Sequence, residues 1–284
     1  MHSQESILVR GLRYHIHVGG PSSGQPLFLL HGLMDTGASF APLAEHLPGW
    51  RLIAPDWRGH GHSERAPQGY WFPDYVADLD LLVAHYTGDG KAILVGHSMG
   101  GQVAALYAGL RSERISRLVL LDSLNLPATP AEDIPRRYRA WLDAQQQRPR
   151  PRSYANREQL AGRIRKRYPE LAAEQTQKLA RAWSQPGADG QVQLVSDPLH
   201  RVPFPMGFHP AEAMAVWRRI QAPTLYLEGG DSPGRRWLSG DEMQRRRACF
   251  ADLQHAILPG CGHMLHLEQP TRVGEHIAAF VQRG

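Results

Sequence analysis

The sequence predicts an α/β fold, a mostly parallel sheet flanked by helices, with an inserted helical cap. Three observations support this prediction. Short, nearly continuous apolar runs recur along the chain, segments with a helical period separate them, and the alternation stops over residues 127–219. Alternating strands and helices are typical of a parallel sheet with right-handed crossovers.

The apolar runs predict the strands of this sheet. Each run is short, contains few polar positions and is bounded by turn residues. Strands that helices cover on both faces require such runs, whereas a strand with one face exposed to solvent has alternating apolar and polar side chains. The runs are residues 26–32, 51–57, 91–98, 115–123, 222–230 and 255–260.

The start of the chain has a different pattern. Residues 7–20, ILVRGLRYHIHVGG, alternate apolar and polar side chains, which predicts an antiparallel hairpin at the edge of the sheet. Segments with a helical period follow at residues 40–47, 75–86, 101–110 and 271–283.

The central stretch predicts the cap. It is rich in Pro, Arg and Gln, and a structureless loop of this length is improbable in a compact domain. We therefore expect residues 1–126 and 220–284 to form the core and residues 127–219 to cover the carboxyl edge of the sheet, where open α/β sheets bind ligands. Four aromatic residues are candidates for an apolar substrate pocket, although packing of the cap on the sheet is the more common role of such residues: Trp141, Trp183, Phe204 and Phe208.

Composition limits the partners of the protein. No apolar run approaches the roughly 20 residues of a membrane span, and the first residues are too polar for a signal peptide. The formal net charge of +5 comes mostly from arginines of the middle third, which lack the aromatic platform of a nucleic-acid surface. We expect a cytoplasmic protein with a small-molecule substrate and no nucleic-acid or membrane partner; the oligomeric state is left open.

The two cysteines, Cys249 and Cys261, have no paired metal-ligand spacing and are expected to be buried free thiols. The sequence therefore predicts neither a disulfide nor a cysteine metal site.

Ser98 is the candidate nucleophile. The segment GHSMG, residues 96–100, follows a predicted buried strand and opens a predicted helix. A serine on so sharp a turn adopts strained backbone angles, and its neighbours two residues away must lack side chains for the strand and the helix to pack closely. Gly96 and Gly100 meet that requirement.

A serine nucleophile needs a base, and a carboxylate to orient that base. His263 lies on the loop after the last predicted strand, in the segment LPGCGHMLHLEQP. His266 is the alternative, but it already lies in the approach to the final helix. We therefore favour His263 as the base.

Four segments resemble motifs of the α/β-hydrolase superfamily: LLHGLMDTGASF, DWRGHGHS, GHSMGG and GCGHMLHLEQP. Within the superfamily the chain looks closest to serine hydrolase-like proteins and, more distantly, to haloalkane dehalogenases. The resemblance implies an oxyanion hole made by the backbone N–H groups of Leu33 and Met99. It places His31 beneath that loop, as a candidate substrate contact, and it implies loop-fixing roles for Asp56, Arg58 and His60.

The resemblance leaves open which carboxylate completes the catalytic triad with Ser98 and His263. Superfamily chains usually carry it after the seventh strand in a G-x-x-D arrangement, whereas Asp231 follows Gly229 by two residues. Asp122, at the end of the run 115–123, matches the position used by dehalogenases with a sixth-strand acid. We favour Asp231, keep Asp122 as the rival acid, and place Glu228 last.

These residues predict a serine hydrolase that cleaves a carboxylic ester or thioester of a small, apolar substrate through an acyl-enzyme, with no metal or organic cofactor. The serine argues against epoxide hydrolysis and dehalogenation, which use an aspartate at this position. Hydrolysis of a carbon–carbon bond or a cofactor-free lyase reaction keeps the serine and stays open. A non-catalytic small-molecule receptor is the alternative from another class.

Overall fold

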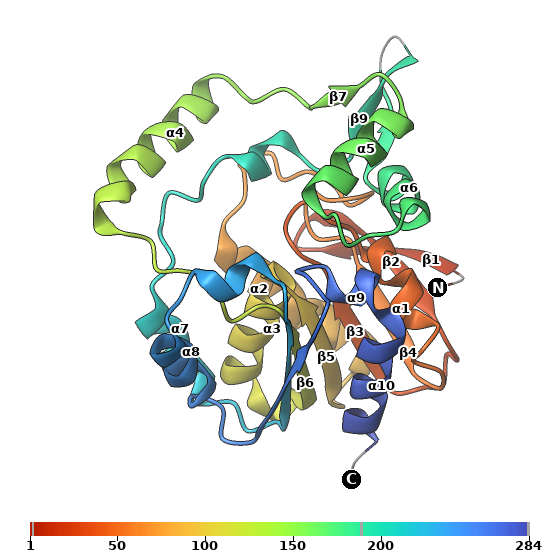
Figure 1. Ribbon diagram of the computed structural model, residues 1–284, viewed down its shortest axis with the longest axis vertical. Helices are drawn as coiled ribbons and strands as arrows, with labels where there is room; N and C mark the ends of the chain where they lie inside the picture. The colour runs from red at the N-terminus through yellow and green to blue at the C-terminus, as the bar shows by residue number, and fades with distance from the viewer. Residues whose placement is uncertain (2, 188–189, 283–284) are drawn as a thin grey trace.

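The computed structural model describes residues 1, 3–187 and 190–282, and it has the expected α/β architecture (Figure 1). Eight strands form one sheet in the order β1-β2-β4-β3-β5-β6-β10-β11. The pairs β1–β2 and β2–β4 are antiparallel, and the other neighbours in the sheet run parallel. The N-terminal hairpin and the mostly parallel sheet are therefore confirmed. The strands are β1 (Ser3–Val9), β2 (Leu12–Gly19), β3 (Pro26–Leu30), β4 (Arg51–Pro55), β5 (Ala92–His97), β6 (Ile115–Leu121), β10 (Thr224–Gly229) and β11 (Leu253–Leu258).

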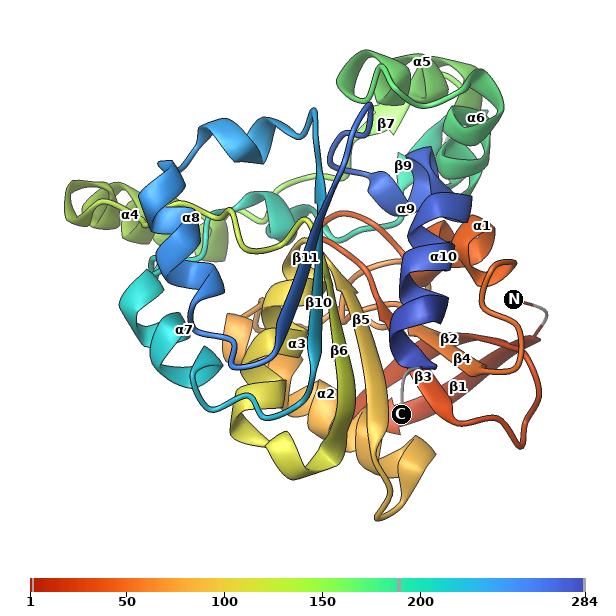
Figure 2. The ribbon, with the colours of Figure 1, turned by 60° about the horizontal axis from the view of Figure 1, so that its bottom comes forward.

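Helices cover both faces of this sheet (Figure 2). The buried strand residues fall into two clusters: Leu94 of β5 packs with α2 and α3, whereas its neighbours Ile93 and Val95 pack with α1 and α10. Because successive side chains of a strand point to opposite faces, two covered faces require a continuous apolar run. The helices of the core are α1 (Ala41–Ala44), α2 (Phe72–Thr87), α3 (Met99–Leu110), α7 (Pro210–Trp217), α8 (Gly240–Arg247), α9 (Leu265–Glu268) and α10 (Pro270–Val281).

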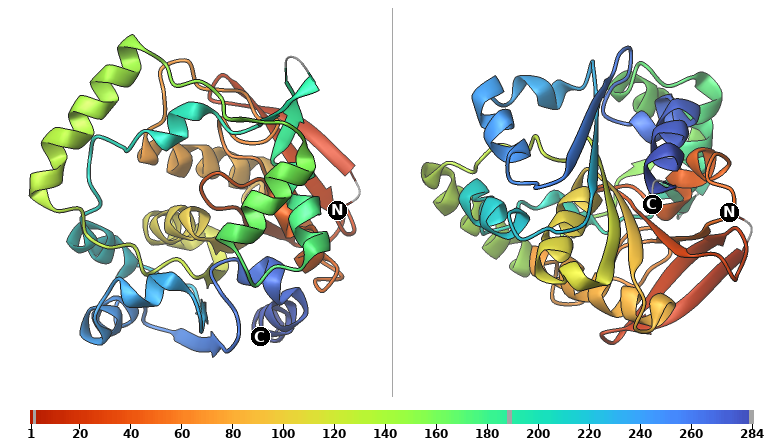
Figure 3. Two further views of the ribbon diagram at one scale, coloured as in Figure 1. Left: turned by 45° about the horizontal axis from the view of Figure 1, so that its top comes forward. Right: turned by 90° about the horizontal axis from the view of Figure 1, so that it is seen from below.

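The segment between β6 and β10 lies over the carboxyl edge of the sheet, with α4 on one side of the molecule and α5 and α6 on the other (Figure 3). It holds α4 (Ile134–Gln146), α5 (Arg157–Arg167), α6 (Ala173–Ala182) and a small antiparallel sheet that the sequence did not predict, β7 (Ser153–Tyr154), β9 (Val192–Leu194) and β8 (Ser184–Pro186). Helix α7 falls within the range expected for the cap, but it packs against α3 and places Trp217 in the main core.

Several expected boundaries shift. The helix expected over residues 40–47 is only the single turn of α1, and the helix expected over 271–283 is α10, ending at Val281; residue 283 lies outside the described part of the chain. Both cysteines are buried and free, as expected. None of the helices formed by the described residues combines the length and the apolarity that crossing a bilayer requires.

Candidate active site

Ser98 lies on the sharp turn between β5 and α3. Its backbone has φ 51° and ψ −117°, in the left-handed region that side chains rarely adopt. The turn brings strand and helix so close that a Cβ on Gly96 would lie 2.5 Å from the carbonyl oxygen of Gly100, and a Cβ on Gly100 would lie 2.1 Å from that of Leu30. The glycine spacing is thus a steric requirement of the turn that presents Ser98.

His263 and Asp122 meet at the carboxyl edge of the sheet. His263 Nδ1 lies 2.6 Å from Asp122 Oδ2, and the carboxylate is fully buried. A carboxylate only accepts hydrogen bonds, so Nδ1 donates, and a neutral His263 keeps Nε2 free to accept a proton. The Ser232 hydroxyl donates to the same carboxylate at 2.6 Å, and the Gly229 N–H approaches its other oxygen at 3.4 Å.

The preference for Asp231 as the acid does not match this geometry. The Asp231 side chain is exposed, and its backbone N–H donates to the Cys261 carbonyl at 2.9 Å. The residue three positions after Gly229 is Ser232, whose hydroxyl supports Asp122. Glu228, placed last, is paired with Arg235 and His255.

Two residues that the sequence did not single out hold the loop of His263. His97 Nε2–H donates to the His263 carbonyl at 2.8 Å, and burial keeps the pKa of His97 well below its ordinary value, so this ring is neutral. The Glu268 carboxylate accepts from the backbone N–H groups of Gly262 and Met264. Two sequence signals could have found these residues. His97 directly precedes Ser98, and Glu268 lies in the segment GCGHMLHLEQP that also holds His263.

The rival base His266 lies beneath the site. Its ring is fully buried, 4.8 Å from the Phe40 ring and 4.4 Å from the His97 ring. Burial lowers its pKa to about 3. His266 therefore packs in the core rather than facing the solvent-accessible side of Ser98.

The loop after β3 carries the candidate oxyanion-hole residue Leu33. Its predecessor Gly32 packs on the nucleophile: a Cβ there would lie 3.1 Å from Ser98 Cβ. Met99 is the first residue of α3, so its N–H belongs to the helix N-terminus, where backbone donors lack helical partners. Met99 thus follows Ser98 in the chain and Leu33 follows the glycine that packs on it, and their role as oxyanion donors stays a prediction.

His31 fixes this loop instead of contacting substrate, which corrects its place among the candidate substrate contacts. Its ring is fully buried, Nδ1 donates to the Gly32 carbonyl at 2.7 Å, and Nε2 accepts from the Trp57 N–H at 2.9 Å. Burial lowers the pKa of His31 to about 4, so the ring keeps this neutral tautomer. The His60 ring supports the same loop by accepting from the Met34 N–H at 3.2 Å.

The four cap aromatics make packing contacts. Phe204 and Phe208 are partly buried against the main core. The Trp141 ring lies 5.8 Å from that of Trp71, and Trp183 Nε1–H donates to Asp35 Oδ1 at 2.7 Å. Substrate contact by any of them stays a prediction.

Asp35 provides a pH-dependent test of the contact between cap and core. Burial raises its pKa to about 6. Between the pKa of the unfolded chain, near 4, and pH 6, the folded protein holds a proton that the unfolded chain has lost, so this group makes the free energy of unfolding fall as pH rises, by up to about 3 kcal/mol. An Asp35→Asn variant lacks that titration.

We therefore expect the stability of the wild type, measured relative to Asp35→Asn by urea unfolding, to decrease from pH 4 to pH 7. The buried histidines near Asp35 titrate in both proteins, so the comparison isolates the carboxyl group. A difference between the two proteins that stays constant over this range would contradict the expectation.

Two groups of described residues have donor atoms close enough to share a metal ion. They are His15, His17 and Asp56, and, beside the site, Asp35, His97 and His266.

The fold and the arrangement at its carboxyl edge are those of an α/β hydrolase. A family model described as "alpha/beta hydrolase fold" matches residues 25–270, and the chain belongs to that family. A crystal structure of a hypothetical protein from Pseudomonas aeruginosa PAO1 resembles this one with a TM-score of 0.87 and 30% identity, over 100% of this chain and 99% of the other.

Two of the curated relatives with a similar sequence are a serine hydrolase-like protein and an esterase. A serine hydrolase-like protein of Danio rerio is 41% identical over 120 residues, which are 41% of this chain and 36% of that protein. The chain thus matches little more than a third of that relative. The esterase YbfF of Escherichia coli K12 is 28% identical over 266 residues, covering 91% of this chain and 94% of that esterase.

Proposed function

We propose that the protein is a serine hydrolase that cleaves a carboxylic ester or thioester, with Ser98 as nucleophile, His263 as base and Asp122 as acid. The observation that carries the proposal is the joint placement, at the same sheet edge, of Ser98 on a strained turn and of the partly exposed His263 paired with the buried Asp122. The similarity to the esterase YbfF, over nearly the whole of both chains, supports ester cleavage as the reaction.

In this mechanism His263 Nε2 removes the proton of Ser98 while the serine oxygen attacks the carbonyl carbon of the substrate. Asp122 holds the ring by its Nδ1–H and stabilises the imidazolium that forms. The N–H groups of Leu33 and Met99 donate to the oxyanion, and one such donor is typically worth about 3 to 4 kcal/mol.

Collapse of the tetrahedral intermediate expels the alcohol or thiol, which takes the proton from His263 and leaves an ester of Ser98. Water, deprotonated by the same ring, then attacks this acyl-enzyme and releases the carboxylic acid. These steps use side chains and backbone N–H groups of the protein together with water.

The proposal is tested with a fluorophosphonate probe, which phosphonylates activated serines. We expect the wild type to be labelled, Ser98→Ala to lose labelling, and Ser6→Ala, a change at an exposed residue of β1, to retain it. Parallel assays with p-nitrophenyl esters of increasing acyl length measure turnover and rank substrates. Equal labelling of Ser98→Ala and the wild type would refute the proposal, and a labelled protein that turns over no ester or thioester would refute the reaction class.

A further inference from the structure

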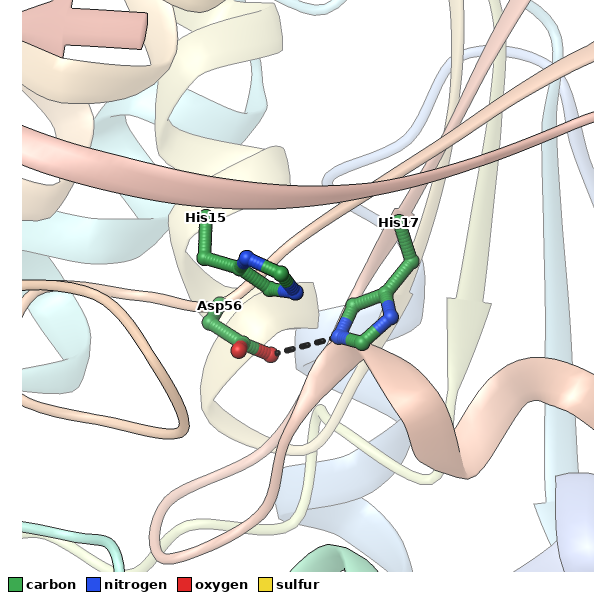
Figure 4. Close-up of side chains that lie close together, drawn as sticks. All are labelled: His15, His17 and Asp56. Carbon is green, nitrogen blue, oxygen red and sulfur yellow. Dashed lines mark hydrogen bonds and ion pairs between the residues drawn. The ribbon is translucent and has the colours of Figure 1, made fainter. Parts of the chain in front are cut away.

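Outside the candidate active site, strand β2 and the loop after β4 bring two histidines and an aspartate together (Figure 4). His17 pairs with Ala54 in the antiparallel register of β2 and β4, and the Asp56 N–H donates to the His15 carbonyl at 2.8 Å, so Asp56 lies opposite His15. Opposite residues of antiparallel strands share a face, as do residues two apart on one strand. The register itself therefore gathers the three side chains.

Their spacing suits a metal ion. One donor atom of each residue lies within 4.8 Å of the other two, and His17 Nε2 is 3.3 Å from Asp56 Oδ1. Two ligands about 2.0 to 2.1 Å from a tetrahedral zinc lie about 3.3 to 3.4 Å apart, because the angle between them is close to tetrahedral. The His17–Asp56 pair already has this separation, and a small shift of His15 would complete a three-ligand set.

A second observation that points to a metal ligand comes from the His15 ring. Its Nε2 is buried and has no hydrogen-bond partner among the described residues, although buried polar atoms are nearly always paired. Its ring stands edge-on to His17 with 4.7 Å between the centroids. The lack of a hydrogen-bond partner for His15 Nε2 is explained if this nitrogen serves as a metal ligand.

The surroundings leave a route to solvent. His62 is exposed, and its ring centroid lies 5.1 Å from that of His15. The buried Asp56 carboxylate is oriented by the N–H groups of Gly37 and His62, at 2.8 and 2.9 Å. The second His/Asp group, Asp35, His97 and His266, is fully buried, which leaves it no comparable entrance.

We propose that His15, His17 and Asp56 bind one divalent transition-metal ion of the zinc type. Imidazole and carboxylate donors suit zinc, copper and nickel, whereas magnesium and calcium prefer all-oxygen sites. The site is distinct from Ser98 and His263 and takes no part in the proposed reaction.

The test is calorimetric titration of chelator-treated protein with ZnCl₂. We expect one ion per chain, tighter binding as the pH rises from 6 to 8 because imidazole must be unprotonated to ligate, and a higher Tm with zinc. His15→Gln and His17→Gln should each weaken binding at least about tenfold. Glutamine at position 17 retains an amide that can donate to Asp56, so this variant preserves the existing contact while removing the imidazole.

The matched control is His85→Gln, which removes an exposed histidine on α2, far from the cluster in sequence. It should bind zinc as the wild type does. Circular dichroism without zinc establishes that each variant is folded, and either glutamine variant alone suffices if the other fails to fold. Absence of one-to-one binding by the wild type, or unchanged affinity in a folded His15→Gln or His17→Gln variant, would overturn the proposal.

Discussion

Asp122→Asn is expected to lower kcat by on the order of 10⁴-fold while leaving the protein folded. Asparagine has nearly the same shape and retains an oxygen for the Ser232 hydroxyl. It lacks the charge that stabilises the imidazolium of His263, and its amide can favour the tautomer in which Nε2 carries the proton. That tautomer cannot accept the proton of Ser98.

The control is Asp231→Asn, at the acid position that the sequence favoured. Because the Asp231 side chain is exposed, we expect kcat within about twofold of the wild type. Both variants are assayed on the best p-nitrophenyl ester, and their Tm values are compared to exclude unfolding. Loss of activity in Asp231→Asn with full activity in Asp122→Asn would reverse the assignment of the acid.

The strands of the sheet could be predicted because their signal is local. Helices on both faces force every position of β5 to be buried, so a run such as residues 91–98 marks a strand without knowledge of its neighbours. Helix α8 was not predicted because only two of its residues, Met243 and Arg246, are buried, so its sequence shows no clear helical repeat of apolar side chains. Its N-terminal signal was Ser239, whose side chain accepts from the Glu242 N–H at 3.2 Å.

The acid could not be chosen from the sequence because the choice depends on how two loops meet in space. Asp122 and Asp231 both follow strands and both precede His263 in the chain. Asp122 adopts φ 46° at the end of β6, which lies beside β10, and there it receives the Ser232 hydroxyl from the next loop. Ser98 and His263, in contrast, lie in motifs whose local order was enough to nominate them as candidates, and their catalytic roles stay predictions.

The cap was the hardest part to predict, because its strands contain only two or three residues and give no measurable period. Its relation to the site also depends on the tertiary structure. Leu160, Ile164 and Leu179 of α5 and α6 form a cluster with Met264 and Leu267, which follow His263. The cap thus supports the loop of the candidate base.

The largest expected effect on stability belongs to Asp78→Asn on α2. Asp78 is fully buried and accepts two hydrogen bonds of 2.6 Å from the Arg58 guanidinium as well as one from the Tyr14 hydroxyl. Asparagine preserves the volume, so the change removes the charge and leaves Arg58, only 5% exposed, without its main partner. Breaking a buried pair in this way costs about 3 to 5 kcal/mol.

The free energy of unfolding should fall toward the lower end of that range, about 3 kcal/mol, because Asp74 Oδ2 stays 3.2 Å from Arg58 Nη1 and retains part of the charge interaction. Urea unfolding at pH 7 measures the loss. Glu174→Gln is the matched control, since Glu174 pairs with Lys178 on the exposed surface of α6, and we expect no measurable change there. A loss below about 1 kcal/mol in Asp78→Asn, the size typical of an exposed pair, would show that Arg58 finds sufficient compensation from Asp74 and that the buried pair does not fix the loop after β4.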